Sequence, residues 1–465
     1  MDNSNKKYSF LRSYIHGEVA FGFWGFVSKG LVGVNALLII SQLDVYRYGL
    51  YVLIFAFYSL VTSVTLRPMS QVIFNDIARF NTEGRVDKAK KLFLENFFIR
   101  MSIAVFLFLG VFFGADVIAR FYGEDVAILF RILSFVFVAD AFYTSVRILF
   151  QVHLRFTFLI FRDVLYRCIK LLFLLGFLFF AQLNITEAML AHVVALFIVV
   201  FMFIPLYAKL YRSWNMVSPA KESVFLSVVK THGKWSVFST MVSSVTTNIR
   251  PWLVQLFINT EAVAIFSIAQ SLFGGIKTFI PNSTLSALFP REMSDKSRRS
   301  YILLRGTKYL VLFSLILATA GFFVAPLVIK LVLPQYLASI PLFLILLPAL
   351  PLVNFQSMAS KFLVALRKQR AMFFISIVKI IIRIVLPVAF LYFFGLVGMA
   401  LERVVSTIII GVVMYGYMLR CNVLDVSWKT MFTFDEEDKK FMTRAFVIMR
   451  THIREIFAKY LTRSL

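Results

Sequence analysis

Residues 373–419 read FFISIVKIIIRIVLPVAFLYFFGLVGMALERVVSTIIIGVVMYGYML. This stretch contains two apolar runs, 373–393 and 396–419. A helix that crosses a bilayer needs about 20 mainly apolar residues, and each run meets that length. The stretch therefore predicts two consecutive membrane-spanning helices.

The whole chain has the composition of a membrane protein. Its 465 residues are 60 % apolar and 16 % charged, whereas soluble domains are about 45–50 % apolar and about 25 % charged. This composition excludes a soluble enzyme, and the 54 Phe residues exclude intrinsic disorder. The two cysteines, Cys168 and Cys421, lie far apart without a metal-like spacing partner. We therefore expect no disulfide framework, no metal site and no cofactor.

Twelve segments of the chain are long and apolar enough to span a bilayer. They cover residues 20–41, 47–72, 93–116, 127–152, 161–181, 187–207, 235–257, 262–289, 306–329, 341–366, 373–393 and 396–419. The sequence therefore predicts an all-α polytopic membrane protein with twelve transmembrane helices.

The positions of the cations predict the orientation of these helices. With the N-terminus in the cytoplasm, the cytoplasmic segments hold 32 Lys and Arg residues, and the external loops hold only Arg47, Arg120 and Lys330. Positive charges collect on the cytoplasmic side of membrane proteins. We therefore expect both termini to be cytoplasmic. Topology also accounts for most of the net charge of +25, so no nucleic acid partner is expected.

Short matches recur along the chain at a spacing of 210–212 residues. Gly22-Phe23-Trp24 matches Gly233-Lys234-Trp235, and His192-Val193-Val194 matches Arg403-Val404-Val405. These offsets indicate a duplication with six helices in each half. Because six is even, the halves have the same orientation, which predicts two parallel six-helix lobes with a site between them.

The predicted domains follow from this repeat. They are a cytoplasmic N-terminus (1–19), an N-lobe (20–207), a cytoplasmic linker (208–234), a C-lobe (235–420) and a cytoplasmic tail (421–465). Within the tail, residues 436–463 show apolar residues at helical spacing among many cations. This pattern is typical of an amphipathic helix on an anionic membrane surface, and a helix that docks on a partner protein is the alternative.

Fourteen Lys and Arg residues fall inside the predicted spans. A charge near the bilayer centre is costly, so it usually faces a cavity, a partner or the interior of the bundle. The deepest of these cations are expected to line a cavity, and they are Lys29, Lys170, Arg250, Lys277 and Arg383. Arg67 lies towards the inner end of its span. Arg167 and Lys379 occupy matching positions in the two halves, and each is a candidate cation at the inner mouth.

Carboxylates are scarcer inside the spans. Asp140 is the only one near the middle of a span, and it is a candidate for binding a coupling proton or for a structural salt bridge. Glu402 adjoins Arg403, and an ion pair between these two is the plain interpretation.

No pattern of catalytic residues stands out. The sequence has no glycine-rich phosphate loop, no metal-binding cluster and no G-x-S-x-G motif. The predicted external loops are also too short for a catalytic domain. These features disfavour a membrane-embedded glycan polymerase or transferase, and we expect a protein that is not an enzyme.

Several segments resemble the oligosaccharide flippases of the polysaccharide transport (Wzx-like) family, in the multidrug/oligosaccharidyl-lipid/polysaccharide exporter superfamily. The resemblance lies in the run Phe23 to Ile40 followed by Tyr48-Gly49-Leu50-Tyr51, in Glu261 to Pro290 followed by Arg291-Glu292-Met293-Ser294, and in Phe323 to Tyr336.

This resemblance implies transport of an undecaprenyl-pyrophosphate-linked oligosaccharide repeat unit across the bacterial inner membrane, for O-antigen, capsule or exopolysaccharide assembly. The cavity cations Lys29, Arg67, Arg250 and Lys277 would converge on the pyrophosphate. The expected partners are this lipid-linked substrate, membrane lipids and polysaccharide polymerase or assembly proteins. An ion-coupled exporter of drugs or metabolites is the alternative within the superfamily. The scarcity of mid-span carboxylates argues against cationic drugs as cargo.

Overall fold

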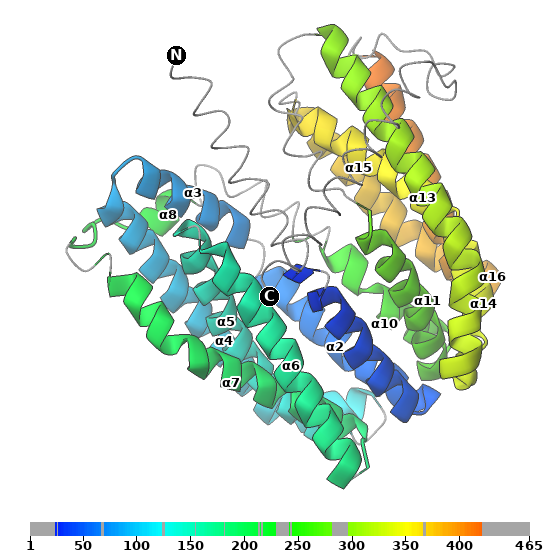
Figure 1. The fold of residues 1–465 in the computed structure, drawn as a ribbon, viewed down its shortest axis with the longest axis horizontal. Helices are drawn as coiled ribbons and strands as arrows, with labels where there is room; N and C mark the ends of the chain where they lie inside the picture. The colour runs from blue at the N-terminus through cyan, green and yellow to red at the C-terminus, as the bar shows by residue number, and fades with distance from the viewer. Residues whose placement is uncertain are drawn as a thin grey trace, which may run out of the picture. The chain divides into compact units, whose positions relative to one another are not determined.

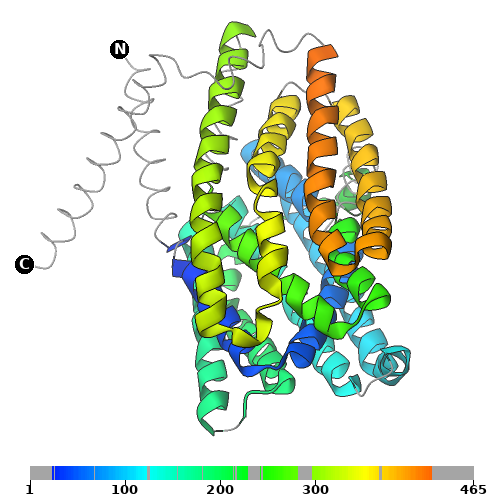
Figure 2. The same ribbon diagram turned by 90° about the vertical axis from the view of Figure 1, so that its right-hand side faces the viewer.

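The computed structural model describes residues 24–25, 27–66, 69–122, 126–153, 155–180, 182–212, 214, 217–228, 241, 244–280, 296–365 and 369–420. Within these ranges all regular structure is helical, as Figure 1 and Figure 2 show. The segment 1–19, the side chain of Arg67 and the predicted tail helix 436–463 lie outside the described residues.

The described helices follow one another with short connections. In the first half of the chain they are an apolar first helix (Val27–Gln42), α2 (Val45–Thr65), α3 (Ser70–Thr82), α4 (Val86–Tyr122), α5 (Ala127–Val152), α6 (Phe156–Phe180), α7 (Ile185–Arg212) and α8 (Val224–Val228). In the second half they are α10 (Arg250–Phe257), α11 (Thr260–Thr278), α13 (Lys296–Val332), the 3₁₀ helix η3 (Pro334–Tyr336), α14 (Ser339–Leu346), α15 (Ala349–Ala365) and α16 (Gln369–Arg420).

Six of the described helices are long and apolar enough to cross a membrane. They are α2, α5, α7, residues Val86–Arg120 of α4, Gly306–Val332 of α13 and Phe374–Arg420 of α16. A bent pair, α14 with Ala349–Ser360 of α15, is a further candidate span. The 25-residue helix α6 is also long enough, but it carries four charged residues, Arg162, Asp163, Arg167 and Lys170.

Two predicted spans are interrupted in the structure, each near a proline. The span expected over 47–72 ends at Thr65, and the separate helix α3 begins at Ser70. The span expected over 341–366 divides into α14 and α15, which are bent by 42° where Pro348 lies. A proline disfavours the helical conformation of the residue before it and removes a backbone donor.

The helix α16 contains the two predicted spans 373–393 and 396–419. Gly395 interrupts it with φ of 57° and ψ of −141°, a conformation that is open to glycine and strained for other residues. Just beyond the break the backbone is tightly packed, because a Cβ atom at Gly398 would collide with the carbonyl oxygen of Phe390. The predicted division into two spans is therefore confirmed.

The chain forms two compact units. The first contains residues 1–273, 322–346 and 376–403, and the second contains residues 274–321, 347–375 and 404–465. In the second unit, Gln356 of α15 donates a hydrogen bond to the carbonyl oxygen of Thr407 at 2.5 Å. The bounds predicted for the N-lobe (20–207) and the C-lobe (235–420) stay a prediction.

In the first unit, α5 is the helix around which its neighbours pack. It contacts α4 and α7 along much of its length (Figure 1). Small residues such as Ala139, Ala141 and Ser145 are fully buried and allow neighbouring helices to approach closely. The core also contains Phe130, Leu133 and Phe137 from α5, Ile54 and Tyr58 from α2, and Met189 and Leu196 from α7.

A close contact joins the beginning of α2 to the beginning of α11. A Cβ atom at Gly49 would lie 2.8 Å from Cγ2 of Thr260 and would overlap the Thr260 carbonyl group. Asn259 caps α11 by accepting a hydrogen bond from the Ala262 N–H at 2.8 Å, which holds this turn in place. The contact therefore requires glycine at position 49.

Replacing Gly49 by alanine should therefore force α2 and α11 apart. Overpacking of this kind costs about 1–3 kcal/mol, so Gly49→Ala should lower the thermal unfolding midpoint of the protein in detergent. Gly110→Ala is the matched control, because a Cβ atom there meets nothing within 4 Å and alanine is the better helix former. Equal midpoints for the two variants would contradict the close contact.

Candidate functional site

A buried ion pair in the first unit joins α10 to α16. The side chain of Arg250 is 3 % exposed and that of Glu402 is fully buried. The Nη2 atom of Arg250 lies 3.0 Å from Oε1 and 2.8 Å from Oε2 of Glu402. Arg250 is the first residue of α10, and Glu402 follows the Gly395 break in α16. Two segments distant in sequence therefore meet through opposite charges.

Two more cations interact with this pair, and a third interacts with one of them. Arg383 and Arg403 interact electrostatically with both Arg250 and Glu402, and Lys379 interacts with Arg383. Lys379 and Arg383 lie four residues apart and share one face of α16. We call Lys379, Arg383, Arg403, Arg250 and Glu402 the α10–α16 cluster. It contains four positive charges and one negative charge.

This excess of positive charge is costly in a membrane protein. Burial of several ions carries a large desolvation penalty, and one carboxylate offsets only part of it for this number of cations. Arg250 also keeps a buried Nη1 group that has no hydrogen-bond partner among the described residues. A buried donor without an acceptor costs about 1–3 kcal/mol. A cluster with this charge balance is chemically able to bind an anion or water.

A second group of polar residues joins the first helix to α6. Arg167 donates hydrogen bonds to the carbonyl oxygen of Ser28, at 2.6 Å, and to its hydroxyl oxygen. The side-chain amide of Asn35 donates to the carbonyl oxygen of Arg167 at 3.2 Å. These bonds fix the two helices together, so the structure gives Arg167 a packing role in addition to any role at a cavity mouth.

Lys170 lies one turn beyond Arg167 and faces α7. It interacts electrostatically with His192, whose Nδ1 atom is 2.7 Å from the hydroxyl group of Tyr166. The ring of Phe55 packs edge-on against His192 with centroids 5.0 Å apart. No carboxylate in the described part of the chain forms an ion pair with Lys170.

Asp140 lies on α5 in the electrostatic range of Arg100 and Tyr166. It forms no ion pair within the described ranges. Arg100 instead donates a hydrogen bond to the Ser70 hydroxyl group at 2.7 Å. Both roles predicted for Asp140, in proton binding and in a salt bridge, stay open.

Three other predicted site residues, Lys29, Arg67 and Lys277, are not members of the α10–α16 cluster. Lys29 is exposed on the first helix, and Arg67 lies outside the described residues. Lys277 is partly exposed on α11 and belongs to the second unit. The expected meeting of Lys29, Arg67, Arg250 and Lys277 therefore stays a prediction, whereas Arg250 and Arg383 do lie in one cluster.

The sequence interpretation missed the main ion pair. Glu402 pairs with Arg250, which is 152 residues away, and its pairing with the adjacent Arg403 is not the principal contact. Side chains of adjacent residues on a helix point about 100° apart and rarely face each other. This geometry already argued against an ion pair between Glu402 and Arg403.

Comparison with known proteins adds a family and a fold. Residues 23–295 match the family described as polysaccharide biosynthesis protein. No curated protein sequence matches the chain significantly. Among solved structures, the chain is similar to a multidrug resistance MATE family transporter of the MOP superfamily in an inward-facing conformation. The TM-score is 0.69 at 15 % identity, over 85 % of this chain and 94 % of that one.

Two further structures are similar over almost their whole length. The lipid II flippase MurJ, in an inward closed conformation, has a TM-score of 0.65 at 13 % identity, over 93 % of each chain. The MATE multidrug transporter DinF-BH, solved as a complex, has a TM-score of 0.64 at 16 % identity, over 88 % of this chain and 95 % of that one. At this level of identity the likeness shows the fold. It is the predicted all-α polytopic membrane fold of twelve helices in two six-helix lobes.

The charge balance of the α10–α16 cluster predicts how its variants affect stability. Glu402→Gln should lower the free energy of unfolding by about 3–5 kcal/mol, because it removes the carboxylate that pairs with the buried Arg250 guanidinium. Arg250→Gln should cost less, since Arg383 and Arg403 remain near Glu402. Adding Arg250→Gln to Glu402→Gln should then restore part of the loss, because it removes one of the repelling cations.

Denaturation of the purified variants in one detergent measures these differences. Asp116→Asn is the control, because Asp116 and Arg131 form an exposed ion pair at 2.8 Å, and such pairs contribute at most about 1 kcal/mol. Losses that simply add in the double variant would contradict the proposed excess of positive charge.

Proposed function

Because the chain belongs to the polysaccharide biosynthesis protein family, we propose that it is a flippase for a lipid-linked oligosaccharide. Its substrate is an undecaprenyl-pyrophosphate-linked repeat unit, which it moves across the bacterial inner membrane for the assembly of O-antigen, capsule or exopolysaccharide. Both termini lie in the cytoplasm. The glycan and its two phosphates cannot cross about 30 Å of hydrocarbon without a polar path.

The observation that carries this proposal is the excess of positive charge in the α10–α16 cluster. Arg250, Arg383 and Arg403 supply guanidinium groups, which bind phosphate oxygens through paired, charge-assisted hydrogen bonds. A pyrophosphate supplies the negative charge that Glu402 alone does not. Binding of the substrate would therefore offset the cost of placing these cations inside the protein, and this cost favours an anionic cargo.

A set of hydrogen bonds at the end of the first helix supports alternating access. Gln335 donates to the carbonyl oxygens of Ile40 and Leu43 at 3.2 and 3.1 Å, and the Tyr336 hydroxyl donates to that of Leu43 at 3.1 Å. Burial raises the pKa of Tyr336 to about 12, so this hydroxyl keeps its proton at neutral pH.

These bonds join segments that belong to the two predicted lobes, on the side that the cation count predicts to be external. They satisfy carbonyl groups that the end of a helix leaves without partners. Rocking of the lobes would have to break them in order to open a path outward, so they act as an external gate in this proposal.

The same fold also serves multidrug transporters, and export of a small molecule is the second candidate function. The charge of the α10–α16 cluster distinguishes the two. Cationic drugs would be repelled by four cations around one carboxylate, whereas a lipid pyrophosphate would be attracted.

Export of the surface glycan tests this proposal directly. Arg383→Gln and Arg403→Gln should each reduce surface glycan by about tenfold or more, because each removes a charge-assisted contact to phosphate. Lipid-linked repeat units should accumulate inside the cell. Arg383→Lys should retain part of the activity, since lysine keeps the charge without the planar two-pronged donor.

The thermal unfolding midpoints of the variants distinguish a loss of transport from a loss of folding. Arg383→Gln should unfold at or above the wild-type midpoint, because it removes one of several repelling charges. Arg131→Gln, in the exposed pair with Asp116, is the control and should export normally. Normal glycan export by Arg383→Gln and Arg403→Gln at wild-type protein levels would refute the proposal.

A further inference from the structure

The first residues of α4 extend beyond the part of this helix that can lie in hydrocarbon. The helix has 37 residues, which corresponds to about 55 Å, whereas the hydrocarbon core is about 30 Å thick. Residues 86–95 carry Asp87, Lys88, Lys90, Lys91 and Glu95, and the apolar part follows them. This end of α4 therefore stands at the membrane surface.

The segment 217–228, which includes α8, is fixed against this end of α4. The Lys90 ammonium group donates to the carbonyl oxygens of Trp214 and Val217 at 3.1 and 3.0 Å. Glu95 accepts hydrogen bonds from the backbone N–H groups of Val224 and Phe225 at 3.1 and 2.8 Å, which satisfies the beginning of α8. The two segments therefore form a fixed surface.

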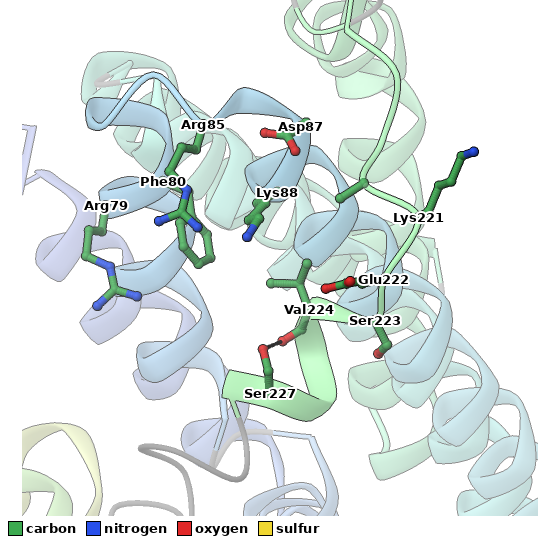
Figure 3. Close-up of a pocket in the computed structure, with 11 residues that line it drawn as sticks. Arg79, Phe80, Arg85, Asp87, Lys88, Lys221, Glu222, Ser223, Val224 and Ser227 are labelled. Carbon is green, nitrogen blue, oxygen red and sulfur yellow. Dashed lines mark hydrogen bonds between the residues drawn. The ribbon is translucent and has the colours of Figure 1, made fainter.

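Two cavities lie between these segments and share Ser223. The first, of about 640 Å³, is polar, and Figure 3 shows the residues around it. Its charged residues are Arg79, Arg85, Lys88, Lys221, Asp87 and Glu222. The second, of about 620 Å³, is lined by Lys91 and Glu95 and by the apolar residues Leu94, Phe98, Ile99, Pro219, Phe225 and Leu226. A polar cavity is thus continued by an apolar one along α4.

Several cations of the polar cavity already have partners. Arg79 pairs with Asp76 at 2.9 Å, and Arg85 lies 3.4 Å from Glu83. Lys88 forms no ion pair with any described residue, and in Figure 3 it points towards the space between Phe80 and Val224. Lys91 is held only by a 3.8 Å contact to Glu95, whose Oε2 atom already accepts two backbone hydrogen bonds. These two lysines are therefore available to a ligand.

The apolar cavity begins at the depth that a lipid chain would occupy. Phe98 lies seven residues beyond Lys91, which is about 10 Å along a helix. Phe98 is 63 % exposed and Leu226 is 54 % exposed, so both present apolar surface to the surroundings. Lysines at the surface and large apolar side chains about 10 Å deeper match the phosphate and the acyl chains of a phospholipid.

We propose that these two cavities bind one anionic phospholipid, with its phosphodiester at Lys88 and Lys91 and an acyl chain along Phe98, Ile99 and Leu226. Among the described residues Lys88 forms no ion pair and Lys91 forms only the 3.8 Å contact to Glu95, which favours a headgroup with a net negative charge over a zwitterionic one. This site is independent of the proposed flippase substrate, because it lies at the surface end of α4 and contains no residue of the α10–α16 cluster.

Native mass spectrometry of the delipidated full-length protein tests this site. The protein is titrated with phosphatidylglycerol or phosphatidylethanolamine of the same chain length. The wild-type protein should bind one phosphatidylglycerol about tenfold or more tightly than phosphatidylethanolamine, because each lysine near a lipid phosphate adds a favourable charge interaction. The variant Lys88→Gln/Lys91→Gln should lose this preference.

The matched control is Lys209→Gln/Lys330→Gln. It removes two exposed lysines and the same charge outside both cavities, and it should keep the preference. All variants should show the wild-type unfolding midpoint, which separates lost binding from lost folding. Equal binding of the two lipids by the wild-type protein would overturn the proposal. So would an unchanged preference in Lys88→Gln/Lys91→Gln, or equal loss in the control.

Glycerol phosphate, which has the headgroup charge without acyl chains, provides the last comparison. It should not displace phosphatidylglycerol at an equal concentration, because it cannot occupy the apolar cavity. Displacement would show that the cavity takes a soluble phosphate ester, and it would refute the lipid site.

Discussion

The excess of positive charge around Glu402 is the constraint on which the account of this protein depends. Three guanidinium groups, those of Arg250, Arg383 and Arg403, interact with one buried carboxylate, and one nitrogen of Arg250 has no hydrogen-bond partner among the described residues. Packing alone would favour apolar side chains at these positions, because a buried ion pair is often less stabilising than well-packed apolar residues of similar volume. Under the proposed function, this cost is offset when an anionic substrate binds.

The α10–α16 cluster belongs to the first unit, which is also held together by uncharged contacts. The apolar core around α5, the close contact at Gly49 and the hydrogen bonds from Gln335 and Tyr336 are each made without any charged pair. The end of the first helix is also held by an apolar cluster, in which Ile40 and Leu43 are buried together with Tyr336, so opening the chain at this point would break apolar contacts as well as hydrogen bonds.

Sequence reasoning predicted the class of fold well and the site only in part. The lengths of the apolar runs predicted the bounds of α5 to the residue and the break in α16 near Gly395. They could do so because a membrane-spanning helix requires a run of about 20 apolar residues. It missed the interruptions near Pro68 and Pro348, where local backbone chemistry overrides hydropathy. It also found the deep cations Arg250 and Arg383 but not the contact to Glu402, since pairing across 152 residues depends on tertiary packing.

The most direct test of the central claim is transport by the purified protein in liposomes. A fluorescent oligosaccharide linked to undecaprenyl pyrophosphate is placed in one leaflet, and its arrival in the other leaflet is measured by quenching. We expect rapid transfer with the wild-type protein, and transfer near the protein-free rate with Arg383→Gln or Arg403→Gln. Transfer by these variants at the wild-type rate, or a wild-type protein that moves a cationic dye and not the lipid pyrophosphate, would contradict the central claim.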